Sequence, residues 1–140
     1  NEIRPGTYIF NDRNTVAGGA CGVDGCAASV ITTVVSTARP GQVIIDGGSK
    51  TFSSDRLAGA GEEAGFGLFP EEPRAVLFRM NEEHGFVDVR ACHTSFRVGD
   101  RLRVIPNHIC TAVNLHQAIH GVRGEQVVAS WTVAARGRLQ

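Results

Sequence analysis

The run Ser29-Val-Ile-Thr-Thr-Val-Val-Ser36 decides the fold class of this chain. Six of its eight residues are Val, Ile or Thr, and β-branched side chains favour extended backbone over helix. Shorter runs of the same character lie on both sides of it: Gly6–Phe10, Gln42–Asp46, Ala75–Met80, Phe86–Val89, Arg101–Ile105 and Gln126–Val133. The sequence therefore predicts a chain built mainly of short strands.

Turn residues separate these runs. The 17 glycines are spread along the 140 residues, and several stand beside Pro or Asp in turn pairs such as Pro40-Gly41 and Gly99-Asp100. No stretch keeps a helical period; Ser49–Leu57 and Leu115–Ile119 each predict a short helical turn. Leu57–Pro70 is the one loop long and glycine-rich enough to be mobile or functional. Many short strands with few helices predict an antiparallel β-barrel or β-sandwich.

Length and charge exclude several classes of protein. The chain is long enough for one domain, 1–140, and its 42% hydrophobic residues argue against disorder. Its 14 basic and 14 acidic residues cancel, so it lacks the electrostatic footprint of a nucleic-acid binder. No apolar run approaches the ~20 residues of a membrane helix, so we expect no membrane partner.

The N-terminus and the cysteines suggest the compartment. Asn1 is not Met and no apolar leader segment follows it, which indicates a trimmed chain or part of a longer one. Without a secretory signal we expect a cytoplasmic protein. The four cysteines then predict free thiols or metal ligands in preference to two disulfides.

The strongest candidate site is the segment Pro106-Asn-His-Ile-Cys110. If the segment is extended, His108 and Cys110 point to the same face, because side chains alternate along a strand. Imidazole and thiolate side by side make half of a zinc-type site, and two protein ligands leave positions open for water or substrate. The alternative interpretation is a half-buried histidine and an inert core cysteine.

A second interpretation uses more of the cysteines. Cys21 and Cys26 have a C-x4-C spacing and, joined to His108 and Cys110, would form a structural zinc site with three sulfur ligands. The adjacent pair Cys92-His93 would face opposite ways on a strand and could not chelate one ion together.

Other reactive side chains have simpler explanations. Lys50 is the only lysine, so any Schiff-base chemistry in this chain would use it, although its turn position predicts a solvated side chain. Glu82-Glu83-His84 fits either an acid–base pair or a charged hairpin turn. His116 and His120 would share a face only on a helix, and we interpret them as surface residues.

Several blocks together resemble a known family. They are Arg4–Asp12, Asp46–Asp55, Glu82–Gly85, Gly99–His116 and Val133–Gly137. In this order they resemble the C-terminal metal-binding β domain of the D-serine dehydratase and D-threonine aldolase family. These enzymes use pyridoxal phosphate and have the alanine-racemase fold type. The Pro-Asn-His-x-Cys block is the most specific of the matches.

The resemblance implies roles for the residues of this block. In the family the corresponding His and Cys bind a divalent metal, zinc in the dehydratases, which implies His108 and Cys110 as metal ligands. The metal would act as a Lewis acid on the β-hydroxyl of a D-β-hydroxy amino acid. Pyridoxal phosphate is held by a lysine of an N-terminal α/β barrel that this chain lacks. Lys50 matches a different block and is not that lysine.

The resemblance thus implies one domain of a larger lyase. The partners would be the missing barrel domain, a small D-amino acid and a second subunit in a homodimer, and the isolated chain would be inactive. The same metal ligands serve dehydration and aldol cleavage, so the reaction stays open. The alternative is a free-standing, non-catalytic metal-binding or interaction module derived from that domain.

Overall fold

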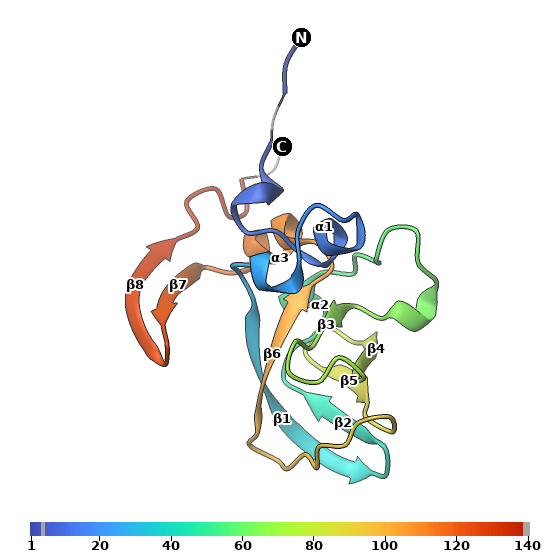
Figure 1. Cartoon of the computed structure of the whole chain (residues 1–140). Helices are drawn as coiled ribbons and strands as arrows, with labels where there is room; N and C mark the ends of the chain where they lie inside the picture. Colours follow the sequence, from blue (N-terminus) through green and yellow to red (C-terminus); the bar gives the residue numbers. More distant parts are fainter. Residues whose placement is uncertain (4, 139–140) are drawn as a thin grey trace.

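The computed structural model of the chain describes residues 1–3 and 5–138 (Figure 1). Its main body is one antiparallel sheet of six strands in the order β3-β6-β1-β2-β5-β4. The strands are β1 (Val30–Arg39), β2 (Gln42–Ile45), β3 (Gly67–Leu68), β4 (Val76–Met80), β5 (Gly85–Asp88) and β6 (Arg101–Pro106). The sheet curls into a nearly closed barrel, which confirms the predicted mainly-β, barrel-like fold.

The run that decided the fold class is the central strand β1. It pairs with β6 on one side and β2 on the other, so its β-branched residues support two neighbours. The two edges of the sheet approach each other where the backbone N–H of Phe66 donates to the carbonyl of Leu77 at 2.9 Å. This bond lies beside β3 and β4 and nearly completes the barrel.

The core lies inside this barrel. Its fully buried members include Val34, Ile45, Leu77, Val87 and Val104, each contributed by a different strand. In β2 and β5 every second residue is buried, as expected where one face of a strand points into a barrel. Complete burial of one such side chain stabilises the fold by about 1.5–3 kcal/mol.

Short helices gather at one end of the barrel, at the top of Figure 1. They are α1 (Arg13–Ala17), α2 (Ser49–Phe52) and α3 (Ile109–Leu115), with the 3-10 turns η1 (Thr7–Ile9) and η2 (Val23–Gly25). A third 3-10 turn, η3 (Glu62–Ala64), lies at the side of the barrel, next to β4. None of the helices in the described residues has the length and apolar character needed to cross a membrane.

Two local predictions were wrong at this end of the barrel. Gly6–Phe10 forms η1 and not a strand, because the carbonyl of Thr7 accepts from the N–H groups of Phe10 and Asn11. The helix expected over Leu115–Ile119 is α3, which begins earlier and ends at Leu115. The turn expected within Ser49–Leu57 is α2, as predicted.

A separate two-stranded hairpin completes the chain. It consists of β7 (Ala118–Arg123) and β8 (Gln126–Thr132), and Figure 1 shows it projecting from the barrel. Trp131 lies across Gly121, where a Cβ atom would come within 2.8 Å of the indole ring. Val122, Val127 and Trp131 are each more than half exposed. The hairpin therefore presents apolar side chains to its surroundings.

Candidate functional site

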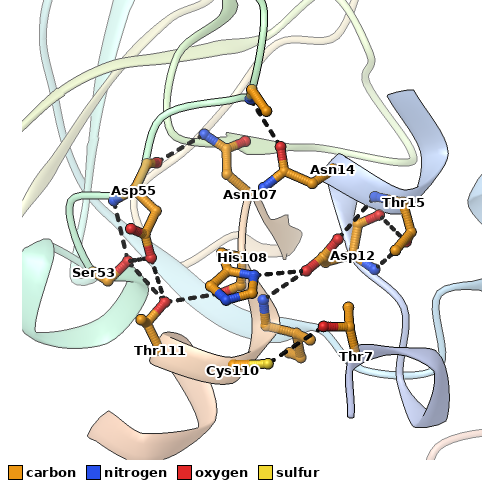
Figure 2. A network of polar contacts seen from close by, with 12 residues as sticks. Thr7, Asp12, Asn14, Thr15, Ser53, Asp55, Asn107, His108, Cys110 and Thr111 are labelled. Atoms are coloured by element: carbon orange, nitrogen blue, oxygen red, sulfur yellow. Dashed lines mark hydrogen bonds and ion pairs between the residues drawn. The ribbon is translucent and has the colours of Figure 1, made fainter. Parts of the chain in front are cut away.

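His108 and Cys110 lie where β6 passes into α3 (Figure 2). β6 ends at Pro106, and His108 is the N-cap of α3, with Cys110 in the first helical turn. The condition of an extended segment is met only up to His108, because the chain turns into a helix at Ile109. His108 is half-buried, whereas Cys110 is exposed, so Cys110 is not an inert core cysteine.

The residue that holds His108 is Asp12, which is fully buried. One carboxylate oxygen, Oδ2, lies 3.2 Å from His108 Nδ1 and accepts from the backbone N–H of Ile109 at 3.0 Å. The other oxygen accepts from the backbone N–H of Thr15 at 2.9 Å. Asp12 thus connects α1 to the start of α3 and fixes the imidazole between them.

A local motif places Asp12 at this position. Asp12 is the N-cap of α1, and the hydroxyl of Thr15 accepts from the N–H of Asp12 at 2.8 Å. Together with the bond from the N–H of Thr15 to the Asp12 carboxylate, this bond forms a capping box. The spacing Asp-x-x-Thr in the sequence indicates such a box. The sequence analysis missed this signal, and with it the partner of His108.

Cys110 faces the N-terminal segment. Its Sγ lies 3.4 Å from Oγ1 of Thr7, a residue of η1. Figure 2 shows the Cys110 and His108 side chains at the first turn of α3, with Thr7 and Asp12 opposite them. A pair of soft and borderline donors therefore lies at an accessible position between two segments distant in sequence.

A second carboxylate, Asp55, supports α3 from the other side. Its side chain accepts hydrogen bonds from the hydroxyls of Thr111 and of Ser53, the latter at 2.8 Å. The bond from Thr111, reinforced by Ser53 and by the nearby His108, lowers the pKa of Asp55 below its ordinary value. Ser53 has a φ of 66°, a backbone conformation that is strained for a residue other than glycine.

Asn107 anchors the site to the loop that the sequence marked as mobile or functional. Its buried amide donates to the carbonyls of Asp55 and Gly65 at 3.0 and 2.9 Å. Arg13 donates to the carbonyl of Gly67 at 3.0 Å and lies 3.4 Å from the Asn107 side-chain oxygen. The start and end of this loop are thus tied to α1 and to the end of β6.

The structural zinc site with three sulfur ligands is not formed. Across residues 1–3 and 5–138, no group of three or more His, Cys, Asp or Glu side chains is placed to hold one ion. All four cysteines are free thiols, and Cys26 is buried next to Cys21. The interpretation that joined Cys21 and Cys26 to His108 and Cys110 was therefore wrong.

The remaining candidates lie outside this cluster. Lys50 and Glu83 form an exposed ion pair at 2.6 Å. The side chain of Asn81 accepts from the N–H groups of Glu83 and His84, so this segment is a charged hairpin turn. His116 contacts the carbonyl of Thr51 at 3.1 Å and His120 contacts Ser130 at 2.8 Å on the hairpin, so the two histidines share no helix face.

The thiols should differ in reactivity. Burial, together with the neighbouring Cys21, raises the pKa of Cys26 to about 11, so little reactive thiolate forms there near neutral pH. Cys110 is exposed and should react first with iodoacetamide, and one equivalent of zinc should slow that reaction selectively. Peptide mass spectrometry over a time course measures all four rates. Equal protection of Cys21 and Cys110 by zinc would contradict the two-ligand site.

The donor set fits a divalent metal with a preference for nitrogen and sulfur. Nδ1 of His108 contacts Asp12, whereas Nε2 makes no hydrogen bond within the described part of the chain. A histidine oriented by a carboxylate through one nitrogen presents the other to a metal in many zinc sites. With the exposed thiol of Cys110 two residues later, in the first turn of α3, two side chains of the types that zinc prefers lie at the start of one helix.

The barrel fold is shared with solved structures of other proteins. An alanine-racemase-like protein from Idiomarina loihiensis has the same fold, with a TM-score of 0.80 at 23% identity over 94% of this chain and 38% of that one. The chain belongs to the putative serine dehydratase domain family, whose sequence profile matches residues 27–122. The family resemblance drawn from the sequence blocks is confirmed.

Named relatives include two enzymes and one uncharacterised protein. The chain is 33% identical to D-threonine aldolase of Arthrobacter sp., matching 97% of this chain and 34% of the aldolase. It is 32% identical to D-threo-3-hydroxyaspartate dehydratase of Delftia sp., matching 93% of this chain and 38% of the dehydratase. It is 36% identical to the uncharacterised protein Rv1414 of Mycobacterium tuberculosis, matching 93% of this chain and 98% of the mycobacterial protein. The chain therefore spans about a third of each enzyme but nearly all of the mycobacterial protein.

Solved structures of such enzymes share the fold. D-threonine aldolase from Filomicrobium marinum gives a TM-score of 0.82 at 27% identity, over all of this chain and 37% of the aldolase. Two variants of D-threo-3-hydroxyaspartate dehydratase give 0.78 and 0.75 at 28% identity, over 94% of this chain and 37% and 38% of theirs. One carries Ala for a His; the other carries Ala for a Cys two positions later and is in a metal-free form.

Proposed function

We propose that this chain is the metal-binding β domain of a pyridoxal-phosphate-dependent lyase that acts on D-β-hydroxy amino acids. The observation that carries the proposal is that His108, oriented by buried Asp12, and the exposed thiol of Cys110 lie two residues apart at the start of α3. The dehydratase variants support it, because their substituted His and Cys have the same spacing. The enzymes among the relatives act on substrates of this class by name.

The proposed roles of the residues follow from their contacts. His108 and Cys110 would hold the ion, with zinc preferred, and two protein ligands leave positions for a substrate hydroxyl. When bound, the metal supplies Lewis-acid polarisation of that hydroxyl, which serves either elimination or aldol cleavage. The bonds from the Thr111 hydroxyl to Asp55 and to the carbonyl of His108 would hold the first turn of α3, and thereby Cys110, in place.

Pyridoxal phosphate would belong to a barrel domain outside residues 1–140. The only lysine, Lys50, is exposed, and its bond to Glu83 raises its pKa, which opposes the neutral amine needed for covalent capture of an aldehyde. We expect no specific adduct at Lys50 after incubation with pyridoxal phosphate and borohydride reduction, and no turnover of D-serine or D-threonine by the chain alone. Peptide mapping checks this, and a stoichiometric adduct abolished by Lys50→Ala would contradict it.

The apolar surface of the hairpin supports the proposal that this protein, which we propose to be cytoplasmic, forms oligomers. Val127 and Trp131 are 62% and 55% exposed on strands with no buried residue, and such surfaces favour association. We expect the isolated chain to self-associate. We expect the full enzyme to be a homodimer. Light scattering after gel filtration should show a mass above 14.9 kDa that falls towards the monomer in Val127→Ser. A strictly monomeric wild-type chain at high concentration would contradict this.

A chimera tests the proposed function. The matching third of the Delftia dehydratase is replaced by this chain, and ammonia release from D-threo-3-hydroxyaspartate is measured with zinc present. We expect activity that is lost in His108→Ala and Cys110→Ala and retained in the exposed control His120→Ala. A folded chimera that binds zinc and pyridoxal phosphate but has no activity would contradict a catalytic role.

The second candidate function is a free-standing, non-catalytic metal-binding or interaction module. It is favoured by the mycobacterial protein, because this chain covers 98% of that protein's length. An inactive chimera, together with tight zinc binding by the chain alone, would favour this module. Tight binding would also contradict the weak affinity that we expect of two protein ligands.

A further inference from the structure

We infer that Asp12 is a positioning residue that sets the tautomer of His108 and thereby directs Nε2 to the metal. The inference rests on the proposed metal site and names a residue of the N-terminal segment, 96 positions before His108. It concerns how the ligand is prepared before any ion arrives. It is therefore testable on the metal-free chain.

The hydrogen bonds of Asp12 determine which nitrogen of His108 carries the proton. The N–H groups of Thr15 and Ile109 can only donate, so both carboxylate oxygens of Asp12 act as acceptors. The contact between Oδ2 and His108 Nδ1 at 3.2 Å is therefore an Nδ1–H donated to Asp12.

Burial carries the second step. Asp12 is 0% exposed, so water does not compete for its oxygens, and the three contacts fix the carboxylate in one orientation. His108 is half-buried and has its backbone at the junction of β6 and α3. With the proton on Nδ1, the lone pair of Nε2 is free to bind a metal, without a change of tautomer on binding.

The variant Asp12→Asn separates two roles of Asp12, which are to cap α1 and to accept from His108. The amide oxygen of Asn still accepts from the N–H of Thr15, which preserves the cap of α1. The amide nitrogen then occupies the place of Oδ2, where it donates to Nδ1 of His108 and moves the ring proton to Nε2, and where it can no longer accept from the N–H of Ile109. The nitrogen intended for the metal would then carry a proton.

The control variant is Thr15→Val. It removes the hydroxyl that accepts from the N–H of Asp12 and disturbs the same cap, but it leaves both contacts of Oδ2 in place. A loss of metal affinity through general destabilisation of α1 would therefore appear in both variants. A loss in Asp12→Asn alone, together with a change of the His108 tautomer, identifies the tautomer as the cause. A loss in Asp12→Asn without that change would come from the lost bond of Ile109 and would contradict the inference.

Two measurements test the inference on the 140-residue chain. Long-range proton–nitrogen NMR of the imidazoles should show His108 as the Nδ1–H tautomer in the metal-free wild type and in Thr15→Val, and as Nε2–H in Asp12→Asn. Zinc titration should show an affinity about 10–100-fold lower in Asp12→Asn, the usual effect of losing the partner of a metal-bound histidine, and little change in Thr15→Val.

The outcomes distinguish this inference from the proposed function. A metal-free wild type with His108 as Nε2–H overturns the inference, and that result needs no variant to fold. Equal zinc affinity in Asp12→Asn and wild type overturns it as well. An Nδ1–H wild type that binds no zinc supports the positioning by Asp12 and contradicts the proposed metal site.

Discussion

Replacement of either His108 or Cys110 by Ala should remove specific zinc binding from this chain. Each change halves the number of protein ligands, so the affinity should fall by more than the about 10–100-fold that loss of an outer partner causes. Calorimetric titration with zinc measures the change. The matched controls are His120→Ala, an exposed histidine on the hairpin, and Cys21→Ser, a cysteine that contacts Thr15 but neither His108 nor Cys110.

The controls decide how the result is interpreted. Wild-type affinity in Cys21→Ser and His120→Ala, with loss in both ligand variants, identifies His108 and Cys110 as the pair that binds the ion. An unchanged affinity in Cys110→Ala would place the ion elsewhere. That result would contradict the metal centre and the lyase function proposed from it.

Among the substitutions proposed here, replacement of Asn107 by Ala should lower the free energy of unfolding most. The change leaves the carbonyls of Asp55 and Gly65 without the donors that now satisfy them in the interior. Each unsatisfied buried carbonyl costs about 1–3 kcal/mol, so the loss of both donors should lower the free energy of unfolding by about 2–6 kcal/mol. That loss is a large fraction of the 5–15 kcal/mol typical of such domains.

Urea denaturation followed by Trp131 fluorescence and circular dichroism measures this change. The control is Asn114→Ala, a half-buried asparagine on α3 with no side-chain hydrogen bond in the described part of the chain. We expect less than about 1 kcal/mol for the control, as for most substitutions outside the core. A similar small effect for Asn107→Ala would show that the loop is not held through this amide.

The barrel was predictable from the sequence because its strands are local β-branched runs. β1, β2, β4, β5, β6 and β8 lie where those runs predicted strands. β3 has only two residues, Gly67 and Leu68, and its strand is made by pairing with β6. β7 begins close to the end of α3, and no turn signal separates the two in the sequence. β3 was therefore missed because its strand depends on a distant partner, and β7 was missed because the sequence does not mark where it begins.

The candidate site was only partly predictable for the same reason. The His-x-Cys spacing identified His108 and Cys110, but the condition of an extended segment is met only up to His108, because α3 starts at Ile109 where its N–H donates to Asp12. That bond joins residues 97 positions apart, and local propensity carries no trace of it. The capping-box spacing at Asp12 was a local signal, but it predicts a helix start and not a partner for His108.

The measurement that tests the central claim most directly is zinc K-edge X-ray absorption of the chain loaded with less than one equivalent of zinc. The account predicts one sulfur ligand at about 2.3 Å and one imidazole nitrogen at about 2.0–2.1 Å, with light-atom ligands such as water completing the shell. The sulfur contribution should vanish in Cys110→Ala. A shell with three sulfur ligands, or with no sulfur in the wild type, would contradict a metal centre built from His108 and Cys110.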